Sequence, residues 1–482
     1  MTLLMVSKKT ITTMKKIIFA IAAVAAMFGS CSQDADLEIV DNVAKPEAIT
    51  SINASSENGT RAVVDGTSIK WQTDDQLGLL GTNASSEAKN TAYTLSSGQG
   101  STSGSFANAS SDITAISATM YPYQEGATWD ATNSKLTLEI PFLQTGVKGS
   151  FDPKAAIMYA IGSSTNQTLS LAVNFLKITI GAGETNVHAV SISSTTTALS
   201  GKMDVTSSGV TAASKGTLNS VTLTAGKGKC FEAGDYYIAV KAGDIANPSV
   251  SYVYYNGDHT ATEKTKAGTG TLAFDDKNVR AINVDFNSGT VTARNAVQLW
   301  ANGPYFATMN IGATSETDYG NYFAWGGTIA YADGDGKSVG EGEYARGPEN
   351  LSGATDTATQ LWGSNWCMPS DNDFWNLLRY SDFTTTTYKW DVVNGVVGRK
   401  FTGKEAYSSN SVFFPTAGYS SYFSGTKITS TGEYGYGYYW SSTVVPGNVS
   451  EALHLSIGIM SNNVTFMTVG ANVMPVRAIL AE

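Results

Sequence analysis

Residues 171–180 read LAVNFLKITI, and apolar and polar side chains alternate through the second half of this segment. Alternation places the apolar side chains on one face of an extended chain, so the pattern predicts a half-buried β-strand. Similar short segments lie at 113–122, 136–141, 187–193 and 236–240, with turn-forming residues between them. Short strands at this spacing, without a long amphipathic helix among them, predict β-sandwiches.

The composition agrees with a β-rich protein outside the cell. Only 15% of the 482 residues are charged and 10% are aromatic, while Gly is abundant. This length predicts about two to four domains. The net charge of −10 argues against a nucleic-acid partner, because phosphate binding needs a basic face.

The first 31 residues carry an export signal. Lys15 and Lys16 precede an apolar run at 17–28, which is shorter than the about 20 residues needed to span a bilayer. Cys31 follows a Gly-Ser pair, and this arrangement resembles a bacterial lipoprotein signal, in which the thiol is acylated and becomes the mature N-terminus. An ordinary secretory signal with a chance cysteine is the alternative. No second long apolar segment exists, so the lipid on Cys31 is the expected membrane attachment.

A polar tether is predicted for residues 32–61, with one short strand around 48–52. Arg61 ends this tether, directly before Ala62. Exposed segments of small residues are preferred sites of proteolysis, so the bond between these two residues is the candidate cleavage site.

The region from 62 to 286 resembles the fimbrillin family, the subunits of type V pili. The motifs that carry the resemblance lie, in family order, at 69–78, 140–144, 149–160, 175–180, 199–201 and 234–240. The resemblance implies two transthyretin-like β-sandwich domains, at 62–168 and 169–290.

The same resemblance implies an assembly mechanism. An arginine-specific protease would cut after Arg61 and remove the lipidated tether. The cut would vacate a groove in the first sandwich, which a strand from the next subunit would fill by β-augmentation. The alternative is that Arg61 lies in a linker that is never cut.

The composition changes from residue 297 onward, where seven of the nine tryptophans lie. Motifs at 362–370, 401–404, 413–419, 437–442 and 475–477 resemble the Fibrobacter succinogenes major paralogous domain family, which is related to C-type-lectin-like folds. The resemblance implies a C-type-lectin-like α+β domain at 297–482. Cys367 departs from the family pattern, because an arginine is usual there.

One helix is predicted in this region, at 370–378. Ser370 can cap the free backbone N–H groups at its start. Phe374, Leu377 and Leu378 follow the i, i+3, i+4 spacing of a buried helix face.

Candidate ligand-binding residues occur at two kinds of position. Trp325 and Trp440 could stack on a sugar ring, although core packing is the favoured interpretation for both. Oxygen-bearing side chains gather in a Gly-rich loop that could hold calcium or a sugar, and these are Asp333, Asp335, Glu341 and Glu343. The alternative is a solvated loop without a ligand.

Enzyme chemistry is not expected. The chain lacks the His-x-x-x-His and Cys-x-x-Cys patterns of zinc sites. Cys230 and Cys367 are interpreted as buried free thiols, because they lie in different predicted domains. No cofactor is predicted apart from the calcium of the acidic loop.

Together these patterns predict a type V pilus tip subunit and adhesin. We expect the protein to reach the outer membrane as a lipoprotein precursor, to be cut at Arg61 and then to join the pilus. The expected partners are other pilus subunits, an arginine-specific protease, and a host or bacterial surface glycan or protein. A surface glycan-binding lipoprotein that is not part of a pilus is the alternative.

Overall fold

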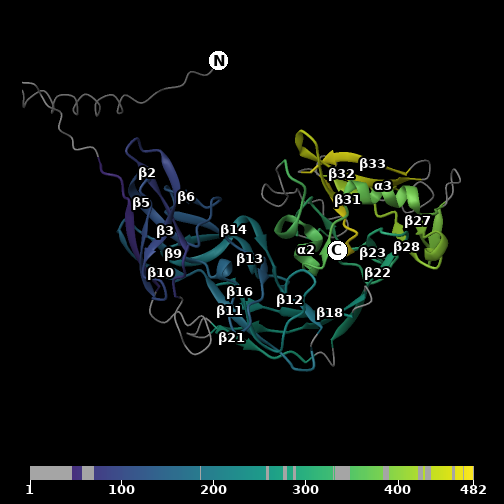
Figure 1. Ribbon diagram of the computed structural model, residues 1–482, viewed down its shortest axis with the longest axis horizontal. Helices are drawn as coiled ribbons and strands as arrows, with labels where there is room; N and C mark the ends of the chain where they lie inside the picture. Colours follow the sequence, from purple (N-terminus) through teal and green to yellow (C-terminus); the bar gives the residue numbers. More distant parts are fainter. Residues whose placement is uncertain are drawn as a thin grey trace, which may run out of the picture. The chain divides into compact units, whose positions relative to one another are not determined.

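The computed structural model describes residues 46–56, 70–184, 186–256, 260–274, 279–285, 289–328, 330–331, 348–383, 390–421, 427–428, 436–458, 462–469 and 472–480 (Figure 1). The elements below all belong to the compact unit Glu47–Glu482. The chain is mainly β and forms several sheets, as predicted. The predicted lipidation site Cys31 and cleavage site Arg61–Ala62 lie outside the described residues.

The first sheet closes into a barrel. Its strands, in spatial order, are β1 (Ser51–Ser56), β10 (Asn166–Leu171), β9 (Met158–Ile161), β5 (Ile113–Tyr121), β2 (Gln76–Asn83), β3 (Ala88–Ser97) and β4 (Ser103–Ala107), and β4 pairs again with β1. All neighbouring pairs are antiparallel except β1 with β10. The first strand of the described chain therefore closes the barrel.

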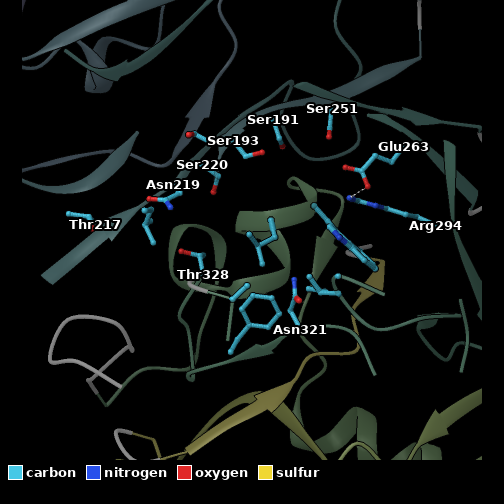
Figure 2. A pocket seen from close by; sticks show the side chains of 18 residues that line it. Ser191, Ser193, Thr217, Asn219, Ser220, Ser251, Glu263, Arg294, Asn321 and Thr328 are labelled. Atoms are coloured by element: carbon cyan, nitrogen blue, oxygen red, sulfur yellow. Dashed lines mark hydrogen bonds and ion pairs between the residues drawn. The ribbon is translucent and has the colours of Figure 1, made fainter. Parts of the chain in front are cut away.

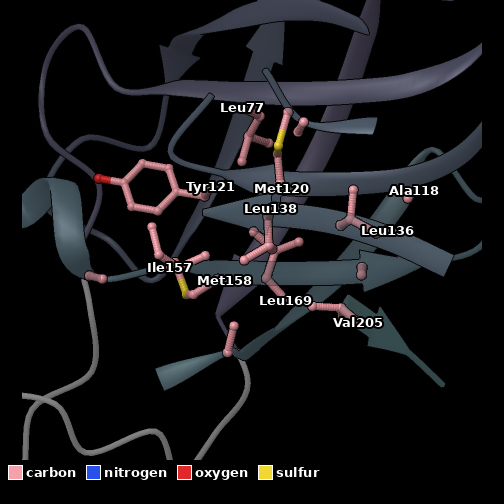
Figure 3. Close-up of a cluster of buried hydrophobic side chains, with 14 of the residues drawn as sticks. Leu77, Ala118, Met120, Tyr121, Leu136, Leu138, Ile157, Met158, Leu169 and Val205 are labelled. Atoms are coloured by element: carbon pink, nitrogen blue, oxygen red, sulfur yellow. The ribbon is translucent and has the colours of Figure 1, made fainter. Parts of the chain in front are cut away.

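The barrel shares its core with a second sheet. This sheet contains β14 (Gly209–Leu218), β13 (Ser200–Thr206), β7 (Lys135–Ile140) and β6 (Thr128–Asp130), in that order. Leu136 and Leu138 of β7 meet Leu77 of β2 and Leu169 of β10 in one buried cluster (Figure 3). The alternation predicted at 136–141 is the cause, because every second side chain of β7 is buried.

A second core lies between two further sheets. One contains β16 (Gly234–Lys241), β11 (Val173–Ile180) and β21 (Val279–Ile282). The other has nine strands in the order β25 (Trp366–Cys367), β35 (Ile479–Leu480), β23 (Tyr305–Ala307), β22 (Thr290–Gln298), β19 (Thr260–Ala267), β18 (Pro248–Tyr255), β12 (Val187–Ser194), β15 (Ser220–Thr224) and β8 (Leu143–Thr145). Leu176 and Ile178 of β11 pack here against Val190 and Ile192 of β12. Residues 173–180 of the segment quoted at the start are thus a mostly buried strand, whereas Leu171 ends β10.

The C-terminal region adds small sheets and short helices. Its sheets are β24 (Tyr322–Phe323) with β34 (Asn472–Pro475), β29 (Tyr419–Ser421) and β30 (Lys427–Ile428); β26 (Asp391–Val393) with β27 (Val396–Thr402) and β28 (Ser411–Pro415); and β31 (Tyr436–Val445) with β32 (Asn448–Gly458) and β33 (Asn462–Thr468). The helices of this region, among the described residues, are η3 (Gly353–Thr355), α2 (Thr357–Trp362), α3 (Asp371–Tyr380) and η4 (Glu405–Tyr407). Earlier in the chain lie the helix η1 (Pro153–Ala155) and the paired strands β17 (Ile245–Ala246) and β20 (Thr271–Leu272).

The predicted capped helix is confirmed as α3. The Ser370 hydroxyl accepts from the Asp373 backbone N–H at 3.2 Å, and the Asp373 carboxylate accepts from the Ser370 N–H at 2.8 Å. Phe374 and Leu377 are fully buried, and Leu378 packs against the same cluster. Helix α3 lies against the sheet of β31, β32 and β33 (Figure 1).

The predicted domain boundaries fall inside strands. The boundary at 168/169 lies within β10, and the interval 290–297 lies within β22. Strand β22 pairs with β19 on one side and with β23 on the other, so a single sheet continues across that interval. The three predicted domains, with their transthyretin-like and C-type-lectin-like assignments, stay predictions.

Candidate functional site

The candidate site is the slot that β1 occupies in the first barrel. Four residues of β1 pair in parallel with β10, and five pair antiparallel with β4. Backbone bonds continue at its rims, where the Asn53 N–H donates to the Thr165 carbonyl at 2.8 Å and the Ser56 N–H donates to the Thr102 carbonyl at 3.0 Å. β1 is therefore hydrogen-bonded along both of its edges.

The side chains of β1 alternate between the core and the surface. Ile52, Ala54 and Ser56 are buried, whereas Ser51 and Asn53 are exposed. The inward series decreases in size from Ile to Ala to Ser. Burying one Ile side chain stabilises by about 1.5–3 kcal/mol, and a net backbone hydrogen bond by about 0.5–1.5 kcal/mol. Backbone pairing therefore makes up most of the attachment of β1, and this contribution depends little on sequence.

The barrel has a well-packed core next to this slot. Trp71 follows the undescribed residues 57–69, is fully buried, and makes edge contacts with Phe106 and Tyr121 at ring-centroid distances of 5.2 and 5.1 Å. Strands β4 and β10, which flank β1, each have a second partner, β3 and β9 respectively. Withdrawal of β1 would expose two unpaired strand edges while leaving six strands paired.

The sequence predicted a strand near this position but not its partners. The expected segment was 48–52, and the observed strand is Ser51–Ser56. β4 and β10 lie far along the chain from β1, so only the closed sheet reveals the slot. The alternation of Ile52 and Ala54 with polar residues was the available signal.

The two candidate stacking tryptophans lie in the core. Trp325 and Trp440 are both 0% exposed. The Trp325 indole N–H donates to the Ser441 carbonyl at 2.7 Å, and that of Trp440 donates to the Phe323 carbonyl at 3.0 Å. A fully buried ring offers no face to a sugar, so the ligand-stacking prediction is corrected and the core-packing interpretation holds for both residues.

The second predicted ligand site is the acidic Gly-rich loop, which was expected to hold calcium or a sugar. Asp333, Asp335, Glu341 and Glu343 all lie outside the described residues. Within the described ranges, no group of three or more His, Cys, Asp and Glu side chains is placed to hold a metal ion. The calcium prediction stays a prediction.

The two described cysteines are free thiols, as predicted. Both are only partly exposed, and burial raises the pKa of Cys367 to about 12, with Asp356 and Asp373 adding to the effect. Such a thiol is almost entirely protonated at neutral pH, so it is a poor nucleophile.

Arg477, in the closing motif of the sequence, is buried in the C-terminal region. Its guanidinium donates to the Asn310 side chain at 2.8 Å and to the carbonyls of Ala307 and Phe413 at 3.0 and 2.9 Å. The following strand, β35, pairs with β23 and with β25. Residues 472–480 are thus integral to a sheet-lined core and are not a free strand.

Among the described residues, no helix is both long enough and apolar enough to cross a membrane.

No protein-family model matches the chain, and no curated protein matches it. Two solved structures resemble it distantly. One is a candidate adhesin from Bacteroides ovatus, with 10% identity and a TM-score of 0.23 over 50% of this chain and 88% of that one.

The other is the tip fimbrial protein Mfa3 from Porphyromonas gingivalis with a C-terminal truncation. It shares 8% identity and a TM-score of 0.18 over 52% of this chain and 82% of that one. TM-scores this low do not support a common fold, so the functional argument rests on the geometry of β1 and its slot.

Proposed function

We propose that this chain is a pilus subunit of the bacterial surface, with an adhesive C-terminal region, that is assembled by strand exchange in its first barrel. The observation that carries the proposal is β1, a strand just upstream of Arg61 that completes the barrel chiefly through backbone bonds. A strand held in this way can be replaced by another strand of different sequence, because the ladder groups are common to every residue except proline.

The proposed sequence of events begins with export and lipidation at Cys31. Cleavage between Arg61 and Ala62 then turns β1 from a covalently attached strand into a separate peptide. A covalent strand competes at high effective concentration, and a cut strand loses this advantage. A segment from a neighbouring subunit can then take the slot.

A tip position is part of the proposal. Within the described residues, the C-terminal motif and β35 are committed to their own sheet and core, so they are unsuited to fill a neighbour's slot. Such a subunit accepts a strand without donating these residues. The four acidic residues Asp333, Asp335, Glu341 and Glu343 remain a proposed contact with a surface ligand.

The test is the incorporation of cleavage-site variants into pili. Arg61→Ala and Arg61→Lys should both leave the precursor folded and at the cell surface, but uncut and absent from isolated pili. Thr60→Ala is the matched control and should be cut and incorporated as the wild type. Incorporation of either uncut Arg61 variant at wild-type levels would overturn the strand-exchange proposal and favour the alternative, a glycan-binding surface lipoprotein outside any pilus.

A further inference from the structure

A second feature lies far from the β1 slot. The nine-stranded sheet has one face that packs against the apolar core formed by β11 and β16, through residues such as Val190, Ile192 and Val250. The opposite face has two parts. One part is small and apolar, and Ala189, Val253, Ala261 and Ala296 join the core of the C-terminal region there.

The other part of this face is lined by hydroxyl groups. Ser191 pairs with Ser251 on β18 and with Thr222 on β15, and Ser193 pairs with Ser249 and Ser220. Alternation along each strand directs these side chains away from the apolar core. The face carries no bulky side chain at these positions, so it forms a flat polar wall.

The C-terminal region covers this wall without filling the space. It is anchored beside the wall by the turn after α2, where the Ser364 and Thr224 hydroxyls lie 2.9 Å apart and the Asn365 side chain accepts from the Gly228 N–H at 2.7 Å. Gly363 has a φ of 91°, and a Cβ there would come within 3.0 Å of Ala189, so this close approach depends on glycine.

The space between the two walls is a cavity of about 580 Å³. This volume is within the about 300–1,000 Å³ typical of small-ligand sites. The sheet contributes Ser191, Ser193, Ser220 and Ser251, which face the cavity in Figure 2. The C-terminal region contributes an apolar side formed by Ile311, Phe323, Leu361 and Trp362.

A buried ion pair lies at the edge of this cavity. Nη2 of Arg294 donates to the Glu263 carboxylate (Figure 2). The guanidinium lies over the Trp362 ring, at 4.5 Å from its centroid. Arg294 is 6% exposed, and its Nη1 has no hydrogen-bond partner among the described residues. This nitrogen is closed off from solvent, so the part of the ion pair that a ligand in the cavity can reach is the Glu263 carboxylate, whose side chain is 18% exposed.

The charges of the cavity select the class of ligand. Arg294 and Glu263 are its charged lining residues and cancel each other. An anion would be repelled by the Glu263 carboxylate and a cation by the charge of the guanidinium, whereas a neutral polyol can donate to the carboxylate and exchange hydrogen bonds with the serine hydroxyls. A sugar ring also has an apolar C–H face, which can lie against Leu361, the partly exposed apolar residue of the C-terminal wall.

We propose that this cavity binds a neutral sugar unit of a surface glycan, with the Glu263 carboxylate and the hydroxyls of Ser191 and Ser251 holding its hydroxyl groups. The inference deepens the adhesive part of the proposed function and rests on it for the source of the ligand. It does not involve β1, the cleavage site or the acidic loop.

The test titrates the full chain with the methyl glycosides of glucose, galactose, mannose and N-acetylglucosamine, and with glucuronate as the charged probe. Binding is followed by saturation-transfer NMR and by calorimetry. Saturable binding of at least one neutral glycoside is expected, with glucuronate binding at least tenfold more weakly. Glu263→Gln should weaken binding at least tenfold, because the carboxylate is the charged acceptor that the sugar hydroxyls can reach.

A second variant tests ligand entry without changing the buried ion pair, so the proposal can still be tested if the first variant does not fold. Asn219 is exposed at the cavity, so Asn219→Trp should block ligand entry and leave the fold intact. Val291→Trp is the matched control, because Val291 lies on the other face of β22 and is 63% exposed. This control should bind as the wild type.

Three outcomes would overturn the inference: no saturable binding of any neutral glycoside, preference for glucuronate, or equal affinity of Asn219→Trp and the wild type. Pilus incorporation of Asn219→Trp is measured in parallel and should be normal. Failure of sugar binding with normal incorporation would remove the cavity proposal alone. Failure of the Arg61 test would remove the pilus assignment and leave the binding data unaffected.

Discussion

Asn53 of β1 and Asn166 of β10 are paired in register, and Nδ2 of Asn53 donates to Oδ1 of Asn166 at 2.9 Å. The Asn53 side chain also accepts from the Ser105 hydroxyl of β4 at 2.6 Å. One exposed residue thus connects β1 to both of its neighbours. A covalent cross-link between these two positions would therefore hold β1 in its slot.

A disulfide between Asn53→Cys and Asn166→Cys should lock β1 in place. The oxidised double variant should be cut after Arg61 and yet retain the cut peptide and stay out of pili, because the slot remains filled. Reduction should restore release and assembly. Retention is checked by non-reducing gel electrophoresis and mass spectrometry.

The matched control joins two strands that are not exchanged. Thr82→Cys with Ala88→Cys lies on the registered pair β2–β3 and should not affect assembly in either redox state. Normal assembly of the oxidised Asn53–Asn166 pair would show that β1 does not have to leave.

Ile52 is the one large side chain through which β1 contacts the core. Ile52→Ala should cost the precursor about 2–4 kcal/mol of unfolding free energy and accelerate hydrogen exchange of the β1 amides, because its burial is the main apolar contribution. Ser51→Ala, at an exposed position of the same strand, should change neither. Equal exchange rates in both variants would contradict a loosely anchored β1.

His454 should make the protein sensitive to acid. It is fully buried without a hydrogen-bond partner among the described residues, and burial lowers its pKa to about 4. The folded pKa lies below the unfolded value of about 6.5, so the unfolded chain binds the proton first as pH falls. This contribution to stability is complete above about pH 6.5 and is lost toward pH 4, by roughly 3 kcal/mol.

His454→Leu should remove this acid sensitivity, because it has no proton to bind. Urea unfolding at about pH 7 and about pH 4.5 measures the difference. His188, whose pKa burial also lowers to about 4, supplies a second such contribution and remains in the variant. An unchanged pH dependence in His454→Leu would contradict the buried neutral state of His454.

Asp356 should be essential to the C-terminal region. One carboxylate oxygen accepts from the Thr359 N–H at 2.9 Å and caps α2, and the other accepts from the Met368 N–H at 2.8 Å. Asp356→Ala leaves two buried donors unpaired and should cost about 2–5 kcal/mol in thermal or urea unfolding. Asp382→Ala, at an exposed carboxylate, is the control and should have little effect.

The sequence predicted local structure well, because local structure follows from alternation and capping. The strand at 173–180 and the helix after Ser370 are examples, since their signals lie within a few residues. Burial of Trp325 and Trp440 depends on residues distant in the chain, so the sequence could not distinguish a stacking ring from a core ring.

The cavity beside Arg294 shows the same limit more strongly. The serines at 191, 193 and 251 have the pattern of a solvent-facing sheet surface, and only the C-terminal region that covers them makes a site. Arg294 and Trp362 are likewise far apart in sequence, and no local motif connects them. The fimbrillin resemblance had implied a groove, but not that Asn53, Asn166 and Ser105 line its opening.

The most direct test of the central claim is the N-terminal residue of the chain recovered from the cell surface and from isolated pili. Strand exchange after removal of β1 predicts Ala62 as the mature N-terminus in pili, determined by mass spectrometry of the N-terminal peptide. A chain in pili that still begins at an acylated Cys31 and retains residues 51–56 would contradict the account.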